Sequence, residues 1–353
     1  MALTDEEVIE QLSHRPRQII GGVINVPELS HSLFVPVSQE HQNPLGRLQV
    51  LPLEILHGCL EYFNLVTLQR LSRVSLRANA VVTSLPKLKI LVSVAWGHLT
   101  ILAQTKVLKL HSVNVLYSAL CSDRCGSCGA YGTFLLLLSA QRCCLTCMLT
   151  NHSLCVIPIG AAERCFGANY QDLVLLPTLR SNRGPFNILG VETCGFEGTK
   201  LLGVEAAVAL AVQKYGSMKQ MDERLAAYNL ETCSYSDRFW LHYRGHSIQP
   251  ASRKPLSIRQ IKERWTDPYA GHGAVHFPSY ANGHISQGYW CRGCEDAYMT
   301  LCSGGMVTDA LARSVPQGWD LAEYIETMCY RAWSKAEFVQ HTKFCHPTIT
   351  DAR

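Results

Sequence analysis

The chain has 353 residues, of which 47% are hydrophobic and 17% charged, so it is long enough to bury a substantial core and to divide into two or three units. Its formal net charge of only +4 argues against a general affinity for nucleic acid or for a membrane surface. The chain holds sixteen cysteines, but its acidic start, MALTDEEVIE, lacks the basic and apolar regions of a signal peptide, so we expect a reducing compartment, cytoplasm or nucleus, rather than disulfides.

Residues 1–46 are rich in His, Gln, Ser and Pro and lack any sustained hydrophobic period. Such a segment has little apolar surface to bury in a core of its own. We therefore predict a loosely ordered arm with one short helix near residues 4–12.

From Leu51 the pattern becomes helical. Pro52 suits the first turn of a helix, and apolar residues follow it at spacings of three and four. A break at Asn64 precedes a second helix, along which an apolar residue recurs every third position, at Leu65, Leu68, Leu71 and Val74. A third helix can start at 76–82. These elements predict a short helical module over residues 47–91 that docks on another protein.

The net positive charge is concentrated in this module. It has two acidic residues, whereas its basic residues are Arg47, Arg70, Arg73, Arg77, Lys87 and Lys89. Because the rest of the chain is neutral overall, an acidic partner is indicated for this module alone.

The most specific chemical motif is CGSCGAYGTFLLLLSAQRCCLTC at residues 125–147. Two C-x2-C pairs, fifteen residues apart, can give one tetrahedral zinc ion four thiolate ligands, Cys125, Cys128, Cys144 and Cys147. Cys143 can replace Cys144, although the second pair would then open as C-x3-C. We expect a buried strand at 134–138 and a helix that opens at Cys144. Arg142 is the only charged residue of the segment, so the site is expected to brace a protein fold and not to contact nucleic acid.

A second candidate site lies near the end of the chain. The pair in Cys291-Arg-Gly-Cys294 is followed, 46 residues later, by two more potential ligands four residues apart on one helical face. The predicted Cys₃His set is Cys291, Cys294, His341 and Cys345. Four ligands leave no open coordination position, so the expected cofactor is structural zinc, one or two ions. Between the two sites we predict helices at 205–215, near 217–228 and at 258–265.

No enzyme motif accompanies these sites. The chain lacks the H-x-E and P-C-x-x-C pair of nucleobase deaminases, the phosphate-binding loop, the dinucleotide fingerprint, H-E-x-x-H and G-x-S-x-G. Its uninterrupted apolar runs are far shorter than the roughly 20 residues of a membrane-spanning helix. We therefore expect neither catalysis nor a membrane partner.

The opening Leu51-Pro52-x-Glu54-Ile55, followed by the L-x-x-L-x-x-L-x-x-V series, resembles the F-box. The two cysteine-rich segments downstream are similar to the C-terminal region of fungal F-box proteins. One departure is that Cys59 and Leu60 stand where the family commonly has a bulkier aliphatic residue followed by a polar one.

The resemblance implies a three-helix module that docks on the Skp-type adaptor of a cullin-RING ubiquitin ligase. By the same resemblance, the residues that meet the adaptor are Leu51, Pro52, Ile55, Leu65, Leu68 and Val74. The predicted fold is then mainly α+β, with the arm at 1–46, the three-helix F-box at 47–91, and an irregular zinc-braced α+β domain at 92–353 whose candidate zinc sites lie at 125–147 and 291–345.

The leading hypothesis is a non-catalytic substrate-receptor subunit of an SCF-type ubiquitin ligase. It binds a cullin through the adaptor and recruits a substrate protein that the sequence does not identify. One alternative is a ligase-independent, zinc-stabilised scaffold or transcription-associated protein. A second is a cysteine- or metal-dependent enzyme, which requires an exposed, low-pKa thiol or an open metal position.

Overall fold

The computed structural model describes residues 4–27, 46–184, 186–188, 191–193, 197–226, 235–246, 269, 271–307, 309–313 and 315–345. The helix predicted at 258–265 lies outside these residues, as does the end of the one predicted near 217–228. The described residues form helices and small sheets, in agreement with the predicted mixed class.

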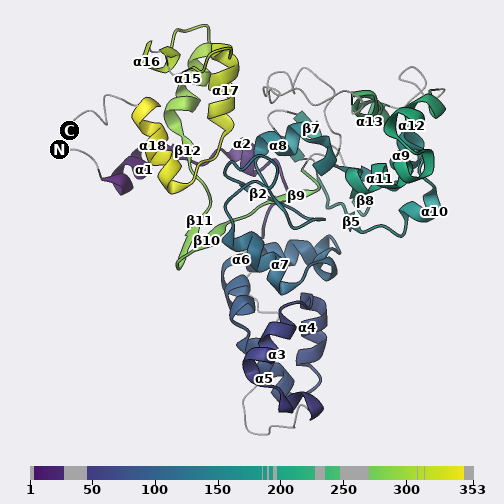
Figure 1. Ribbon diagram of the computed structural model, residues 1–353. Helices are drawn as coiled ribbons and strands as arrows, with labels where there is room; N and C mark the ends of the chain where they lie inside the picture. The colour runs from purple at the N-terminus through teal and green to yellow at the C-terminus, as the bar shows by residue number, and fades with distance from the viewer. Residues whose placement is uncertain are drawn as a thin grey trace.

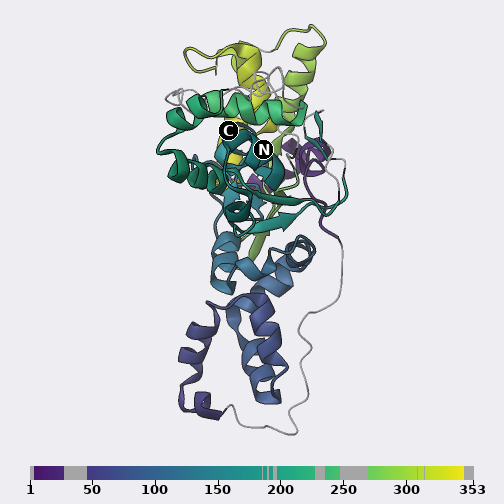
Figure 2. The same cartoon turned by 90° about the vertical axis from the view of Figure 1, so that its right-hand side faces the viewer.

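A helical lobe projects from the rest of the chain (Figures 1 and 2). Its elements are the 3-10 helix η1 (Gly46–Val50), α3 (Leu53–Leu60), α4 (Leu65–Ser72) and α5 (Leu76–Ser84). Side-chain caps set two of the helix starts. Asn64 accepts a hydrogen bond from the Thr67 N–H at 2.9 Å, and Ser75 accepts one from the Ala78 N–H at 3.1 Å. The predicted break at Asn64 is therefore an N-cap.

Pro86 begins a long helix within the predicted module. It occupies the first turn of the 19-residue helix α6 (Pro86–Gln104), where a missing N–H costs no hydrogen bond. The boundary predicted at residue 91 consequently falls inside α6. The 3-10 helix η2 (Leu108–Leu110) and α7 (Val113–Cys121) follow.

One apolar core runs along α6 and joins the helical lobe to the rest of the chain. It includes Leu65 and Leu68 of α4, Leu91 of α6, and residues as distant as Leu135 and Val275. Each of these five side chains is at most 1% exposed. The lobe is thus packed continuously with the downstream domain. No single described helix has the length and apolar character to cross a membrane, and only α5 and α6 taken together, bent by 71°, meet that test.

The central sheet has the order β3-β2-β9. Its strands are β2 (Phe134–Leu136), β3 (Arg142–Cys143) and β9 (Ala274–His276), all antiparallel to their neighbours. Phe134 pairs with Cys143 on one side and His276 on the other. The predicted strand at 134–138 is therefore observed, two residues shorter. Beside the sheet lie α8 (Leu145–Thr150) and the 3-10 helix η3 (His152–Leu154).

A second sheet, of order β4-β8-β5, carries its own helical layer (Figure 1). The strands and helices are β4 (Val156–Pro158), β5 (Thr178–Arg180), β8 (Lys200–Gly203), α9 (Ile159–Phe166), α10 (Tyr170–Leu173), α11 (Val204–Tyr215), α12 (Met218–Arg224) and α13 (Tyr235–His246). The predicted helix at 205–215 coincides with α11, which ends at Gly216 with a φ of 89°. A small hairpin, β6 (Phe186–Ile188) and β7 (Val191–Thr193), lies between β5 and β8 in sequence.

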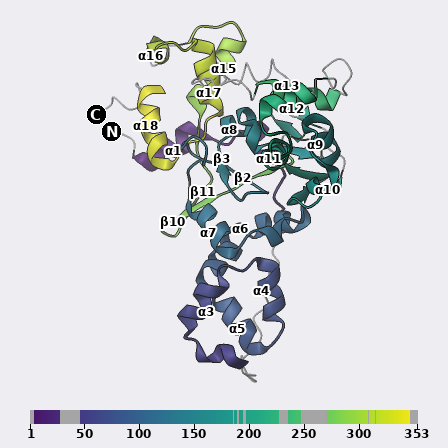
Figure 3. The same ribbon diagram turned by 45° about the vertical axis from the view of Figure 1, so that its right-hand side comes forward.

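The third group of elements brings the two ends of the described chain together, with α1 beside α18 (Figure 3). Its elements are α1 (Asp5–Leu12), β1 (Ser13–His14), α2 (Arg17–Ile20), β10 (Ser279–Ala281), β11 (His284–Ser286), β12 (Trp290–Cys291), α15 (Arg292–Cys302), α16 (Asp309–Arg313), α17 (Leu321–Tyr330) and α18 (Lys335–Cys345). Strand β1 pairs antiparallel with β12, and β10 with β11.

Residues 4–27 differ from the loosely ordered arm predicted for them. The predicted short helix is present as α1, capped by Thr4, and Val8 packs in a core shared with Phe338 of α18. Further along, Val23 is fully buried, and Val26 lies so close to Gly97 of α6 that a Cβ on Gly97 would clash with it. Because these apolar residues are divided among several partners, they form no helical or strand period in the sequence.

The Arg142 side chain ties three segments together from inside the core. It is 3% exposed, and its guanidinium donates to the carbonyls of Ala119 at 2.6 Å, Gly132 at 2.6 Å, Phe277 at 3.1 Å and Pro278. Burial lowers the pKa of Arg142 to about 10, so the side chain stays charged at neutral pH. The end of α7, the turn before β2 and the segment after β9 therefore depend on one residue.

Replacing Arg142 with Met should strongly destabilise the protein, because four buried carbonyls lose their donor. We expect a loss of about 3 kcal/mol or more in the free energy of unfolding. The matched control is Arg124→Met, since the Arg124 side chain is 49% exposed and its ion pairs within the described part of the chain are with Asp123 and Glu337. Urea unfolding of both variants measures the difference, and equal losses would contradict the role given to Arg142.

A buried histidine should make the fold sensitive to acid. His272 is fully buried, and neither ring nitrogen has a hydrogen-bond partner among the described residues. Burial lowers its pKa to about 4 from a usual value of about 6.5. The stability from the neutral ring is therefore complete above about pH 6.5 and is lost as the pH falls toward 4.

His272→Leu should consequently flatten the fall in melting temperature between about pH 6.5 and 4.5. The control is His284→Leu, which replaces an exposed histidine. Differential scanning fluorimetry across this range tests the expectation, and an unchanged profile in His272→Leu would contradict it.

Candidate functional site

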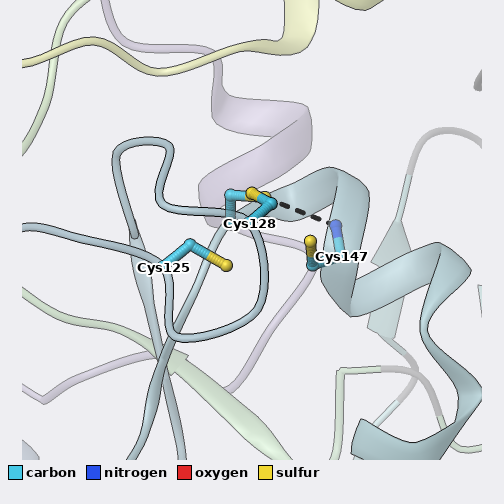
Figure 4. A group of neighbouring side chains, drawn as sticks. Cys125, Cys128 and Cys147 are labelled. Carbon is cyan, nitrogen blue, oxygen red and sulfur yellow. Dashed lines mark hydrogen bonds between the residues drawn. The ribbon is translucent and has the colours of Figure 1, made fainter. Parts of the chain in front are cut away.

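Four cysteines converge beside the central sheet. Cys125 and Cys128 stand on the turn before β2, where Gly129 has a φ of 75° and donates its N–H to the Cys125 carbonyl at 2.9 Å. Cys144 is the N-cap of α8, and the N–H of Cys147 donates to the Cys144 sulfur at 3.4 Å. Figure 4 shows the labelled thiols of Cys125, Cys128 and Cys147 gathered between this turn and α8.

The four thiols are close enough to share one metal ion, since their Sγ atoms all lie within 4.8 Å of one another. Cys125 is buried, Cys144 and Cys147 are half-buried, and Cys128 is exposed. Hydrogen bonds from Cys143, Cys144 and Cys147 lower the pKa of Cys125, and the hydrogen bond to Cys125 raises the pKa of Cys144 to about 12. One thiolate thus opposes ionisation of its neighbours, and a divalent cation bound there would allow all four to ionise.

Cys143 is not a member of this group. It lies in β3 opposite Phe134, is fully buried, and donates its S–H to the Cys144 carbonyl at 3.2 Å. The geometry therefore favours Cys144 as the fourth ligand.

The second predicted ligand set also comes together. Cys291 ends β12, Cys294 lies in the first turn of α15, and the remaining two ligands lie one turn apart on α18. All four ligand atoms are within 4.8 Å of one another, with Cys294 Sγ 3.2 Å from His341 Nε2 and 3.4 Å from Cys345 Sγ. The ring of Trp333 stacks on His341 at 4.5 Å between centroids and holds the imidazole in place. This group can hold a metal ion that links α15 to α18.

The helical lobe leaves an unusual amount of apolar surface in solvent. Half of the sixteen exposed large hydrophobic side chains in the described part of the chain lie between residues 48 and 74. Their exposed fractions are 47% for Leu48, 85% for Val50, 40% for Leu51, 43% for Leu53, 53% for Ile55, 72% for Tyr62, 44% for Phe63 and 75% for Val74. Such a concentration is typical of a surface that binds another protein.

Comparison with known families decides what this lobe is. The family model for the F-box domain matches residues 48–90. The chain contains an F-box domain. No curated protein and no solved structure matches the chain.

Within the F-box, the six residues predicted to meet an adaptor fall into two groups. One group is exposed, namely Leu51, Pro52, Ile55 and Val74, and it is called here the adaptor face after the partner that the sequence predicts for it. The other group is Leu65 and Leu68, which are 1% and 0% exposed and pack in the core along α6. Because these two side chains are buried within the chain itself, they have no exposed surface with which to contact a partner. Their regular spacing in the sequence reflects that burial.

Five exposed apolar F-box residues were not predicted. Leu48, Val50 and Leu53 flank the predicted set, and Tyr62 and Phe63 follow α3. The sequence places more apolar residues around Pro52 than one face of a short helix can bury. This excess could have predicted that some of them are exposed.

The first metal site can be tested with paired cysteine variants. Cys125→Ser and Cys144→Ser should each remove most of one metal equivalent per chain and lower the melting temperature by more than about 5 °C, because three ligands hold the ion poorly. Cys121→Ser and Cys143→Ser should keep the metal. Inductively coupled plasma mass spectrometry of protein grown in metal-supplemented medium gives the content. Loss of metal in Cys143→Ser with retention in Cys144→Ser would reverse the ligand assignment.

The second site has its own matched pair. Cys294→Ser should remove a second metal equivalent and should also speed proteolysis of residues 4–14, because these pack on β12 and α18. Cys302→Ser, at an exposed position of the same helix, is the control. Normal metal content in Cys294→Ser would contradict metal binding by this cluster.

Proposed function

We propose that this protein is a substrate-receptor subunit of an SCF-type cullin-RING ubiquitin ligase. The observation that carries the proposal is an F-box domain whose adaptor face stays in solvent, among other exposed apolar side chains of residues 48–74, while Leu65 and Leu68 are buried. In this role the F-box binds a Skp-type adaptor, and through it a cullin, and the downstream domain holds a substrate protein. The chain then supplies proximity, and the transfer of ubiquitin is carried out by other subunits.

Charge supports the same partner. Arg47, Arg70, Arg73 and Lys89 of the F-box region are exposed, and an acidic adaptor would be drawn toward them. The apolar adaptor face would provide most of the affinity, with these charges increasing the rate of association.

Structural zinc is the metal that best fits both clusters. Four thiolates, or three thiolates and an imidazole, are the donor sets of closed tetrahedral zinc sites. Each set already has four protein ligands, so a metal bound there would stabilise the fold and would leave no position for activating water. Ligation by free thiols also fits a reducing compartment, cytoplasm or nucleus.

Binding of a recombinant Skp-type adaptor to the purified full chain tests the proposal. The Leu51→Ala, Pro52→Ala and Ile55→Ala triple variant should lose binding by about tenfold or more while keeping its metal, since buried anchors dominate such contacts. Isothermal titration calorimetry measures the affinity.

A closely matched control separates the adaptor face from general surface hydrophobicity. Ile55 is 53% exposed and Ile285, on β11 outside the F-box, is 54% exposed. Ile55→Asp should weaken the adaptor complex and Ile285→Asp should not. If the folded, metal-loaded protein fails to bind any Skp-type adaptor, the ligase proposal fails and a ligase-independent scaffold becomes the better explanation.

A further inference from the structure

A groove of about 790 Å³ lies where the F-box meets the downstream domain. One wall is formed by the end of α6 and by η2, with Val66 of α4 beside them. The other wall is the segment 174–177 with strands β5 and β8. The two walls are joined by the N–H of Arg180, which donates to the Thr105 carbonyl at 2.9 Å. We call this feature the basic groove.

Four cations line the basic groove. Lys106 and Lys109 come from the α6 side, and Arg180 and Lys200 come from the sheet side. All four side chains are exposed, and none has a carboxylate partner among the described residues. Favourable contact with the C-terminal end of α6 can account for the two lysines. It does not account for Arg180 and Lys200, which lie on strands.

The backbone at Lys106 is a second, independent observation. The end of α6 is a Schellman motif, in which the Val107 N–H donates to the Leu102 carbonyl at 2.9 Å and the Lys106 N–H to Ala103 at 3.1 Å. Lys106 has a φ of 66° at the position where glycine is the favoured residue. A lysine in this conformation costs backbone energy that a glycine would not. It places a charged side chain, which glycine lacks, on the lining of the groove.

The rest of the lining favours a peptide over a nucleic acid. Leu175 is 82% exposed, Val174 is 42% exposed and Leu110 is 36% exposed, so apolar side chains stand among the cations. No aromatic residue occurs among the described lining residues, and single-stranded nucleic acids are usually held by base stacking on aromatic rings. No acidic residue occurs among them either.

We propose that the basic groove binds an acidic, extended peptide segment of a partner protein, with its carboxylates facing the four cations and an apolar residue against Leu175 and Val174. That this partner is a ligase substrate rests on the proposed function. The binding itself does not, because the groove and the adaptor face share no residue.

Fluorescence anisotropy with the full-length, metal-loaded protein tests the inference. The probe is the labelled peptide Glu-Glu-Leu-Glu-Glu-Leu-Glu-Glu, compared with the same peptide carrying Gln for Glu and with oligothymidine of similar length. At about 50 mM salt, where charge attraction is little screened, we expect the acidic peptide to bind at least about tenfold more tightly than either. A phosphoserine version of the peptide shows whether carboxylate or phosphate is the preferred anion.

Variants locate the binding. Lys109→Glu with Arg180→Glu should weaken peptide binding by about tenfold or more, whereas Lys219→Glu with Arg224→Glu, an equal charge change on α12, should change it less than about twofold. Lys106→Gly should weaken binding while raising the melting temperature, which a purely structural lysine would not do. The Leu51, Pro52 and Ile55 triple variant should bind the peptide normally. The result for the peptide is therefore independent of the result for the adaptor.

Three results would overturn the inference. The first is equal affinity for the acidic and the neutral peptide. The second is an equal loss of peptide affinity in the groove variant and the α12 variant. The third is that oligothymidine binds more tightly than the acidic peptide and that the groove variant abolishes this binding. The last of these would make the basic groove a nucleic-acid site.

Discussion

The continuous apolar core along helix α6 is the feature on which the rest of the structure depends. Leu65 and Leu68 on one side of the helix and Leu135 and Val275 on the other belong to the same buried cluster. Helix α6 covers apolar side chains of the F-box and of the downstream domain. Cutting the chain at residue 91 would therefore expose apolar surface of both parts. Domains joined by a polar linker can move relative to each other, whereas two parts that share one apolar core are held in a fixed arrangement.

The N-terminal residues have a comparable structural role at the opposite end of the molecule. Strand β1 pairs with β12, α1 packs on α18, and Lys335 forms an ion pair with Glu6 at 2.5 Å. The second cysteine group lies beside these contacts. A metal bound there would hold α15 and α18 in the arrangement against which α1 packs. In addition, Arg124, next to the first cysteine group, pairs with Glu337 of α18 at 2.5 Å. The two candidate metal sites are therefore parts of one connected structure.

Local features and the convergence of the cysteine-rich motifs could be predicted from the sequence, whereas apolar packing between distant segments could not. The C-x2-C spacing, the helix start after Asn64 and the strand at Phe134 each depend on neighbouring residues, and the structure has the expected element at each place. The packing of Val26 against Gly97 depends on the whole fold, so no window of sequence contains it. Leu65 and Leu68 illustrate a different limit. Apolar spacing identifies a side chain that avoids water, but it does not say whether the covering surface belongs to the same chain or to a partner.

The position of the basic groove gives the fixed connection along α6 a functional meaning. Val66 lies on the F-box helix α4, while Arg180 and Lys200 belong to the downstream domain, so a peptide in the groove would contact both parts at once. If the chain is a ligase receptor, as we propose, it would not need a flexible linker to bring its substrate near the ligase. The bound peptide would stand at a fixed offset from the adaptor face, and the effective concentration of its lysines would be set by the length of chain that follows the peptide. Such an arrangement would select substrates by the distance between acidic segment and lysine as well as by the acidic segment itself.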